Sequence, residues 1–301
     1  MKRPLCLFLL LILSLNFFCA CADTAQDVGK PVIVSSVFPA YDFARALMGD
    51  TADVKLLLPP GADLHSYEPT PQDVAMIESC DLFLYIGGDG DENIRTLLSR
   101  ESEEKSFSFF DALGITEEAH EEGIDHDHAD EHLWTSPQKA LRMVSALADR
   151  LCALFPREAS AIRERQKTYE KELSALDADY AAFAAASPFL PFADRFPFAP
   201  LCEDYAIAAQ SALSGCGEDS EPSAADLASL IDTVREKAIP VVFYTETSDG
   251  RIARTVQAET GAEPVRLHSC HNLSAEDRKQ NCTYLSLMRE NLDAMKQVLG
   301  K

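Results

Sequence analysis

Residues 157 to 186 carry the apolar pattern of one long amphipathic helix, and this stretch constrains the fold more than any other. Large apolar side chains recur there at steps of three and four residues: Ile162, Tyr169, Leu173, Leu176, Tyr180 and Phe183. At a rise of about 1.5 Å per residue such a helix extends for about 45 Å, which exceeds the width of a small domain. We therefore expect a rigid helix that links two lobes, and a coiled-coil arm is the alternative.

Short apolar runs alternate with helical patterns on both sides of this stretch. The expected strands are 31–37, 54–58, 81–86, 240–244 and 263–267. The expected helices are 40–48, 71–80, 222–237, 250–260 and 283–299. Strands that alternate with helices predict βα units and parallel sheets. The expected fold class is therefore α/β, with two lobes that each contain a mostly parallel β-sheet flanked by helices, joined by one long rigid α-helix.

The N-terminus has the layout of a secretory signal. Lys2 and Arg3 precede an almost uninterrupted apolar run from 5 to 18, and small residues follow it. We assign residues 1–20 to a signal peptide, and a buried N-terminal helix is the alternative. The remaining regions are a linker at 21–30, an N-terminal lobe at 31–156, the linking helix at 157–187 and a C-terminal lobe at 188–301.

The chain is strongly acidic, with 49 Asp and Glu, 27 Lys and Arg, and a formal net charge of -22. Affinity for a polyphosphate depends on clustered Lys and Arg that release counterions, and no basic run of that kind is present. Nucleic-acid binding is therefore excluded, and the sign of the charge favours a cationic partner. Hydrophobic residues at 47% and charged residues at 25% are ordinary globular values, which exclude general disorder.

Six of the nine cysteines lie outside the leader: Cys80, Cys152, Cys202, Cys216, Cys270 and Cys282. An even number in an exported protein permits disulfides, whose pairing the sequence leaves open. Buried free thiols are the alternative for Cys80 and Cys152. No two cysteines have the CxxC spacing, so a zinc site made of thiolates is not expected.

Four of the seven histidines lie in loops just beyond the ends of expected elements. His65 follows the strand at 54–58, and His268 and His271 follow the strand at 263–267. His132 precedes a helix that Ser136 and Pro137 are expected to begin. Ligands of open α/β sheets bind beyond the carboxyl ends of the strands. Neutral imidazoles at this edge are suitable ligands for a divalent cation such as zinc.

The other three histidines, His120, His126 and His128, lie in the acidic loop 117–131. This stretch also holds eight acidic residues and almost no apolar ones. Such a composition cannot form a core, so we expect a mobile loop. The loop is interpreted as a metal-capture segment, and a solvated acidic loop without a special role is the alternative.

Several segments resemble those of the zinc/manganese solute-binding proteins of ABC importers, the TroA-like (cluster 9) metal-binding lipoproteins. They are the segments 61–73, 132–137 and 221–227 together with the His-rich loop, and the resemblance extends from residue 31 to the C-terminus. Residues 18–21 resemble a bacterial lipobox, which implies an acylated Cys21. Cleavage after Ala20 or Ala22 without a lipid is the alternative.

This resemblance implies an exported protein, at the cell surface or in the periplasm, that lipidated Cys21 anchors to the membrane. It implies that a divalent metal ion is captured between the lobes and passed to an ABC transporter permease in the membrane. Zn²⁺ is the expected metal and Mn²⁺ the alternative. We expect a monomer without enzymatic activity.

The resemblance also implies a set of ligands. By position, His65 and His132 correspond to the first two ligands of the family. Ala193 stands where the family has its usual third His, so this chain is a variant in that position. A solvent molecule or one of three carboxylates is the alternative third ligand: Asp194, Glu203 or Asp204.

The fourth ligand of the family is an acid in the loop after a late strand, and this chain has histidines there. We favour His268, because it lies nearer the end of the strand, and His271 is the second choice. A site rich in imidazole favours zinc over manganese, which prefers oxygen ligands.

Two other classes of function remain as alternatives. A zinc hydrolase would need a general base and an open coordination position. No His-Glu-x-x-His helix is present, and the acid considered for the general base is Glu68, three residues after His65. An extracellular metal buffer or adhesin would depend on the acidic loop and would need no permease.

Overall fold

Two parallel four-stranded sheets form the framework of the computed structural model, which describes residues 29–115, 130–213 and 222–300. The first sheet contains β1 Val32–Ser35, β2 Asp53–Leu56, β3 Leu82–Tyr85 and β4 Ser106–Ser108. The second contains β5 Phe189–Phe192, β6 Ala208–Ser211, β7 Val241–Thr245 and β8 Glu263–Leu267. Their orders, β2-β1-β3-β4 and β6-β5-β7-β8, repeat one topology. The expected fold class, with two parallel α/β lobes, is confirmed.

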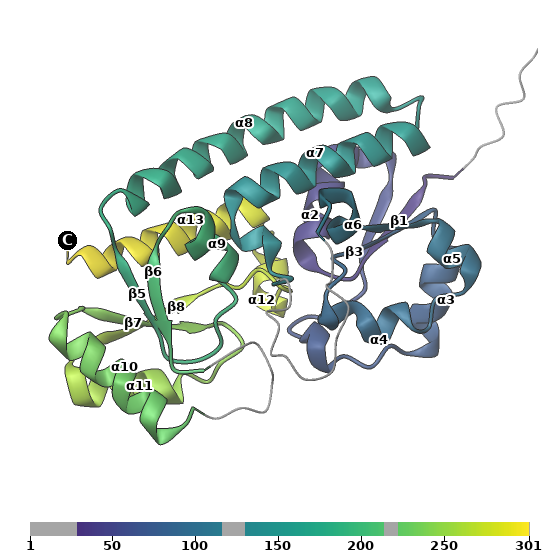
Figure 1. The fold of residues 1–301 in the computed structure, drawn as a ribbon. Coiled ribbons are helices and arrows are strands. Elements are labelled where there is room, and N and C mark those ends of the chain that lie inside the picture. The colour runs from purple at the N-terminus through teal and green to yellow at the C-terminus, as the bar shows by residue number, and fades with distance from the viewer. Residues whose placement is uncertain (1–28, 116–129, 214–221, 301) are drawn as a thin grey trace, which may run out of the picture. The chain divides into compact units, whose positions relative to one another are not determined.

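The helices follow the strands in βα order and flank the sheets (Figure 1). Those of the first half are α2 Phe38–Met48, α3 Pro71–Ser79, α4 Glu92–Arg95, α5 Arg100–Glu104, α6 Phe109–Leu113 and α7 Pro137–Leu154. Those that follow are α8 Ala159–Ala184, α9 Ala199–Asp204, α10 Ala224–Glu236, α11 Arg251–Thr260, α12 Ala275–Lys279 and α13 Tyr284–Met295. Short 3₁₀ turns include η1 Gly49–Thr51, η2 Leu64–Ser66, η3 Asp89–Asp91, η4 Leu133–Thr135 and η5 Lys296–Leu299.

Helix α8 is the long amphipathic helix that the sequence predicts. Its buried residues include Ile162, Leu173, Leu176, Tyr180 and Phe183, which belong to the predicted apolar stripe. The helix packs against α7 and α2 of the first half and against α13 of the second (Figure 1). One continuous helix therefore contacts elements of both halves, as expected for a rigid link.

The C-terminal helix α13 connects the two halves through buried hydrogen bonds. The hydroxyl of Tyr284 donates to the carbonyl of Trp134 at 2.6 Å, and its backbone N–H donates to Asp42 at 2.9 Å. The hydroxyl of Tyr180 donates to the carbonyl of Met288 at 2.8 Å. Residues Pro31–Lys301 consequently form one compact unit, so loops from both sheets are held by a shared core.

Strands β4, β5 and β6 are absent from the sequence-based expectation. The clearest case is β5, where Pro191 pairs in register with Gln210 of β6. Prolines in the segment 188–200 indicate a break, because proline lacks the N–H that an inner strand needs. In β5 the neighbouring residues Leu190 and Phe192 are fully buried, so packing outweighs the lost donor.

The described cysteines, Cys80, Cys152, Cys202, Cys270 and Cys282, are free thiols. This outcome agrees with the alternative reading of Cys80 and Cys152 as unpaired, and Cys216 lies outside the described residues. Cys21 and the predicted signal peptide also lie outside them. In the part of the chain that the structure describes, every helix is too short or too polar to cross a membrane.

Candidate metal centre

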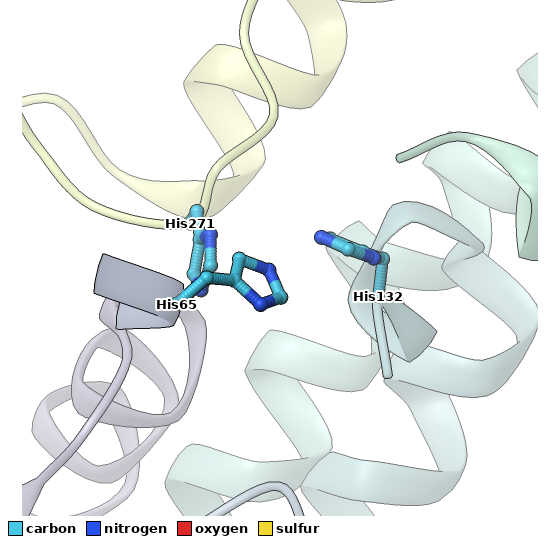
Figure 2. Close-up of side chains that lie close together, drawn as sticks. All are labelled: His65, His132 and His271. Atoms are coloured by element: carbon cyan, nitrogen blue, oxygen red, sulfur yellow. The ribbon is translucent and has the colours of Figure 1, made fainter. Parts of the chain in front are cut away.

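Three histidines from distant parts of the sequence converge at the carboxyl ends of the two sheets. His65 lies in η2, which follows β2, and His132 is the residue directly before η4. His271 lies in the loop after β8. Figure 2 shows the rings of His65 and His271 close together, with His132 projecting towards them from the opposite side. The predicted position beyond the strand ends is therefore where these side chains meet.

The three rings are close enough to share a single ion. One ring nitrogen from each of His65, His132 and His271 lies within 4.8 Å of the other two. Ring centroids are 6.0 Å apart for His65 and His132, 5.3 Å for His65 and His271, and 5.6 Å for His132 and His271. Tetrahedral zinc with bonds of about 2.0–2.1 Å holds its donors about 3.3 Å apart. Small movements of the side chains would therefore suffice for ligation.

Neighbouring acids position two of the histidines, through the backbone at His65 and through both backbone and ring at His132. Asp63 caps η2, and its Oδ1 accepts a hydrogen bond from the backbone N–H of His65 at 3.0 Å. Oδ1 of Asp130 lies 2.8 Å from both the backbone nitrogen and Nδ1 of His132. A carboxylate on one ring nitrogen orients the imidazole and leaves the other nitrogen, Nε2, as the expected metal donor.

Trp134 forms a wall of the site. Its ring centroid lies 5.3 Å from that of His132 and 5.5 Å from that of His271. The indole N–H donates to the carbonyl of Ser269 at 2.8 Å, two residues before His271. Trp134 is fully buried, so one side chain holds the segments that carry two of the three histidines.

The loop after β8 is held on both sides by hydrogen bonds. Asn291 of α13 accepts from the backbone N–H of His268 and donates to its carbonyl, both at 2.7 Å. On the other side, the amide of Asn272 donates to the carbonyls of Pro59 and Ala62 at 2.6 and 2.8 Å. Since residues 59–62 precede His65 in the same loop, this network sets the distance between His65 and His271.

Burial keeps the imidazole of His271 neutral. Burial, together with the neighbouring His132 and His65, lowers the pKa of His271 to about 3. Burial also acts to lower the pKa of His65, but the Glu131 carboxylate outweighs this and raises it above its ordinary value. A neutral His271 nitrogen is available to a metal at pH 7, because no proton has to leave first.

Glu131 also lies in this site, although the sequence analysis did not include it among the expected ligands. Its Oε2 accepts a hydrogen bond from the backbone N–H of Gly90 at 2.8 Å, and its Oε1 lies 2.9 Å from Nε2 of His65. Although burial opposes ionisation, His65, His132 and His271 lower the pKa of Glu131 to about 2. The site therefore contains a buried carboxylate anion beside three imidazoles.

The burial of Glu131 corrects the expectation for the acidic loop 117–131. That expectation of a mobile, solvated stretch is wrong at its end, because Glu131 is only 8% exposed. The physical reason is its pairing with His65 and Gly90, which compensates the loss of water. His120, His126 and His128 lie outside the described residues.

His268, the preferred fourth ligand in the sequence analysis, does not join the cluster. Its Nδ1 accepts a hydrogen bond from the backbone N–H of Cys270 at 2.9 Å. Its ring nitrogens lie 3.5 Å from Glu246 and 3.5 Å from Asp277. The ring therefore faces these two acids, and the structure gathers His271, the second choice, with His65 and His132.

The three carboxylates considered for the third ligand are otherwise engaged or exposed. Both oxygens of Asp194 face the backbone N–H of Thr245, at 3.2 and 3.3 Å. Asp204 accepts from Lys139 at 2.6 Å and from the hydroxyl of Ser136. Glu203 is exposed on α9. None of the three belongs to the described histidine cluster.

A cavity of about 20 Å³ lies between the histidines. His65, His132 and His271 line it together with Asp63 and Arg195, among others. Nη1 of Arg195 donates to Oδ2 of Asp63 at 2.6 Å, so the guanidinium charge is balanced inside the site. A cavity needs about 10–15 Å³ to hold one water molecule. The space therefore suits a single ion or water molecule.

Sequence reasoning missed Glu131, Trp134 and Arg195 as members of the site. Glycines after a strand signal that another group approaches the backbone closely, and Gly87, Gly88 and Gly90 follow the strand β3. These glycines indicate that some group lies close to the backbone, but they do not identify that group as Glu131. The contacts of Trp134 and Arg195 depend on tertiary packing alone.

The sequence is similar to those of proteins whose names refer to zinc. The chain is 33% identical over 304 residues to "Zinc-binding lipoprotein AdcA" of Streptococcus pneumoniae, covering 96% of this chain and 60% of that protein. It is 30% identical over 295 residues to "High-affinity zinc uptake system protein ZnuA" of Bacillus subtilis, covering 92% of this chain and 90% of that protein. The chain thus spans less than two thirds of the length of the pneumococcal relative.

A solved structure shares both the fold and part of the sequence. The Zn(II)-bound ZnuA-like domain of Streptococcus pneumoniae AdcA superposes with a TM-score of 0.74 at 30% identity, covering 91% of this chain and all of that chain. The family model described as "Zinc-uptake complex component A periplasmic" (ZnuA) matches residues 33–298. The chain therefore belongs to the ZnuA family of zinc-uptake components.

Proposed function

We propose that this chain is an extracytoplasmic solute-binding protein that captures a divalent transition metal, zinc in the first place, and delivers it to an ABC permease. The observation that carries the proposal is the convergence of His65, His132 and His271, with one nitrogen of each within 4.8 Å of the others. The cavity between them, about 20 Å³, has room for a single ion, which supports the proposal. Membership of a family of zinc-uptake components supports the transport role.

Zinc is the metal that this donor set favours. Imidazole nitrogens suit zinc, whereas manganese prefers carboxylate and carbonyl oxygens. The names of the pneumococcal and Bacillus relatives refer to zinc, which supports the same choice. Manganese binding by the same residues is the alternative, and competition between the two ions distinguishes them.

The proposed mechanism is capture without catalysis. Metal binding displaces the proton of any protonated ligand, draws the two halves slightly together and stabilises the form that the permease recognises. The hydrogen bonds of Asn272 to residues of the β2 loop, and the shared helix α8, argue against a wide hinge motion. Metal-free and metal-bound forms should therefore superpose apart from local side-chain and loop shifts.

The proposal includes an exported, monomeric protein anchored through a lipid on Cys21. The pneumococcal relative is named a lipoprotein, and Cys21 follows the apolar run of this chain's leader. The segment with His120, His126 and His128 is proposed as an auxiliary capture element. The three clustered histidines lie outside this segment of the sequence, so its removal should leave their site intact.

The test measures zinc stoichiometry and stability of the purified protein. We expect one tightly bound zinc per chain by native mass spectrometry, and loss of that zinc in His65→Ala. At a free zinc concentration 100 times Kd, the free energy of unfolding should rise by about 2.7 kcal/mol.

The control variant lacks residues 117–129 and should keep the tightly bound zinc. If this deletion abolishes tight binding while His65→Ala retains it, the proposed site is wrong and the acidic loop is the main binding device. Hydrolysis of model esters or peptides by the zinc-loaded protein would instead support the hydrolase alternative.

A further inference from the structure

Glu131 is held in a pocket of glycine backbone next to the three histidines. A Cβ atom on Gly88 would lie 2.5 Å from both Cβ and Oε2 of Glu131. A Cβ atom on Gly90 would lie 2.9 Å from Oε1 and 3.0 Å from Oε2. Only glycine at these two positions lets the carboxylate lie where it does, so the backbone after β3 is shaped to receive it.

The two carboxylate oxygens have different surroundings. Oε2 accepts the hydrogen bond from the N–H of Gly90, which fixes the orientation of the group. Oε1 is buried and forms an ion pair with Nε2 of His65 at 2.9 Å. Nε2 of His271 is buried and has no hydrogen-bond partner among the described residues. Because an unpaired buried polar atom is costly, this nitrogen beside a buried carboxylate favours a bound cation here.

Asp63, the acidic side chain among the described residues that line the cavity, is already engaged. Both oxygens of Asp63 are used, one by the backbone N–H of His65 and the other by Arg195. The wall after β5 contributes Arg195 and Pro197, and neither side chain can ligate a metal. The Glu131 oxygen is the carboxylate donor that remains among the described residues of this site.

We infer that Glu131 is the fourth protein ligand, so that Oε1 joins Nε2 of His65, His132 and His271 in a closed tetrahedral zinc site. This inference rests on the proposed function. Four protein donors are the usual complement of a site that holds zinc without exposing it to water. Donors of tetrahedral zinc lie about 3.3 Å apart, so His65 and Glu131, now in contact, need to separate by only a few tenths of an ångström.

Two variants test the assignment by different routes. Glu131→Gln removes the charge and keeps the shape of the side chain. Gly90→Ala keeps the carboxylate but displaces its oxygens, which form the flexible end of a side chain and can shift at little cost to folding. Glu104→Gln is the control for net charge, because the side chain of Glu104 is 72% exposed.

Zinc affinity is measured by competition with a chelator, and the zinc-loaded wild-type protein is crystallised. Substitution of groups behind the ligands costs about 10- to 100-fold in metal affinity. We expect Glu131→Gln to lose more than about 100-fold, Gly90→Ala to lose affinity as well, and Glu104→Gln to match the wild type. In the crystal, Oε1 of Glu131 should lie about 2.0–2.2 Å from zinc.

A zinc site without a bond to Glu131 would overturn the inference, and so would an affinity of Glu131→Gln equal to that of the wild type. In either case the wild-type protein still binds zinc, and the proposed function stands. If the wild-type protein itself binds no zinc, the proposed function fails and the role of Glu131 fails with it. The two failures are therefore distinguishable by the wild-type measurement alone.

Discussion

His271→Asn is expected to lower zinc affinity by more than about 100-fold, which exceeds the usual effect of groups that only orient a ligand. His271 provides one of three clustered ring nitrogens, and its Nε2 is buried without a hydrogen-bond partner among the described residues. Loss of this donor leaves an incomplete coordination shell. The measurement is competition between the purified variant and a zinc chelator at pH 7.

His268→Asn is the matched control, because it removes an equally buried imidazole from the same loop. Nδ1 of His268 accepts from the N–H of Cys270, two residues later, and an Asn side chain makes this type of bond readily. The loop should therefore persist, and the zinc affinity should change by less than about tenfold, below the usual range for orienting groups. The reverse ranking of the two variants would show that His268 is the ligand.

Trp134→Ala is expected to lower the free energy of unfolding of the metal-free protein by about 3–5 kcal/mol. The indole is fully buried, and its N–H donates to the carbonyl of Ser269. Truncation leaves a cavity beside His132 and His271 and leaves that carbonyl without its donor. Urea unfolding of the metal-free protein measures the change and separates it from any effect of zinc.

Two companion variants identify the cause of this loss. Trp134→Phe keeps most of the packing and removes the donor, so it should cost about 1–3 kcal/mol. Leu97→Ala changes a side chain of a residue that is 47% exposed, and the expected cost is within about 0.5 kcal/mol. If Trp134→Ala and Leu97→Ala have equal effects, Trp134 does not support the site as described.

The periodic parts of the fold were predictable from the sequence. The stripe from Ile162 to Phe183 identifies α8, because a helix of this length repeats its apolar face many times. Strand β5 was not predictable, because Pro191 indicates a break and only the buried neighbours Leu190 and Phe192 stabilise it as a strand. Local patterns therefore identify long elements well and short strands poorly.

The loops that carry the candidate site were predictable, but the direction of each side chain was not. His65 and His132 follow from their places beyond element ends. His268 and His271 lie in the same loop, and the hydrogen bonds of His268 with Cys270 and Asn291 decide which ring faces the cavity. Glu131 was missed because its acidic neighbours indicate solvent exposure, whereas its partner Gly90 lies 41 residues away in the sequence.

The central claim is that a single zinc ion binds between the three histidines. Crystallographic anomalous scattering at the zinc absorption edge tests it most directly. We expect one strong peak, bonded at about 2.0–2.1 Å to a ring nitrogen each of His65, His132 and His271. A peak bonded to His268 instead, or no peak within bonding distance of these three rings in zinc-saturated crystals, would contradict the account.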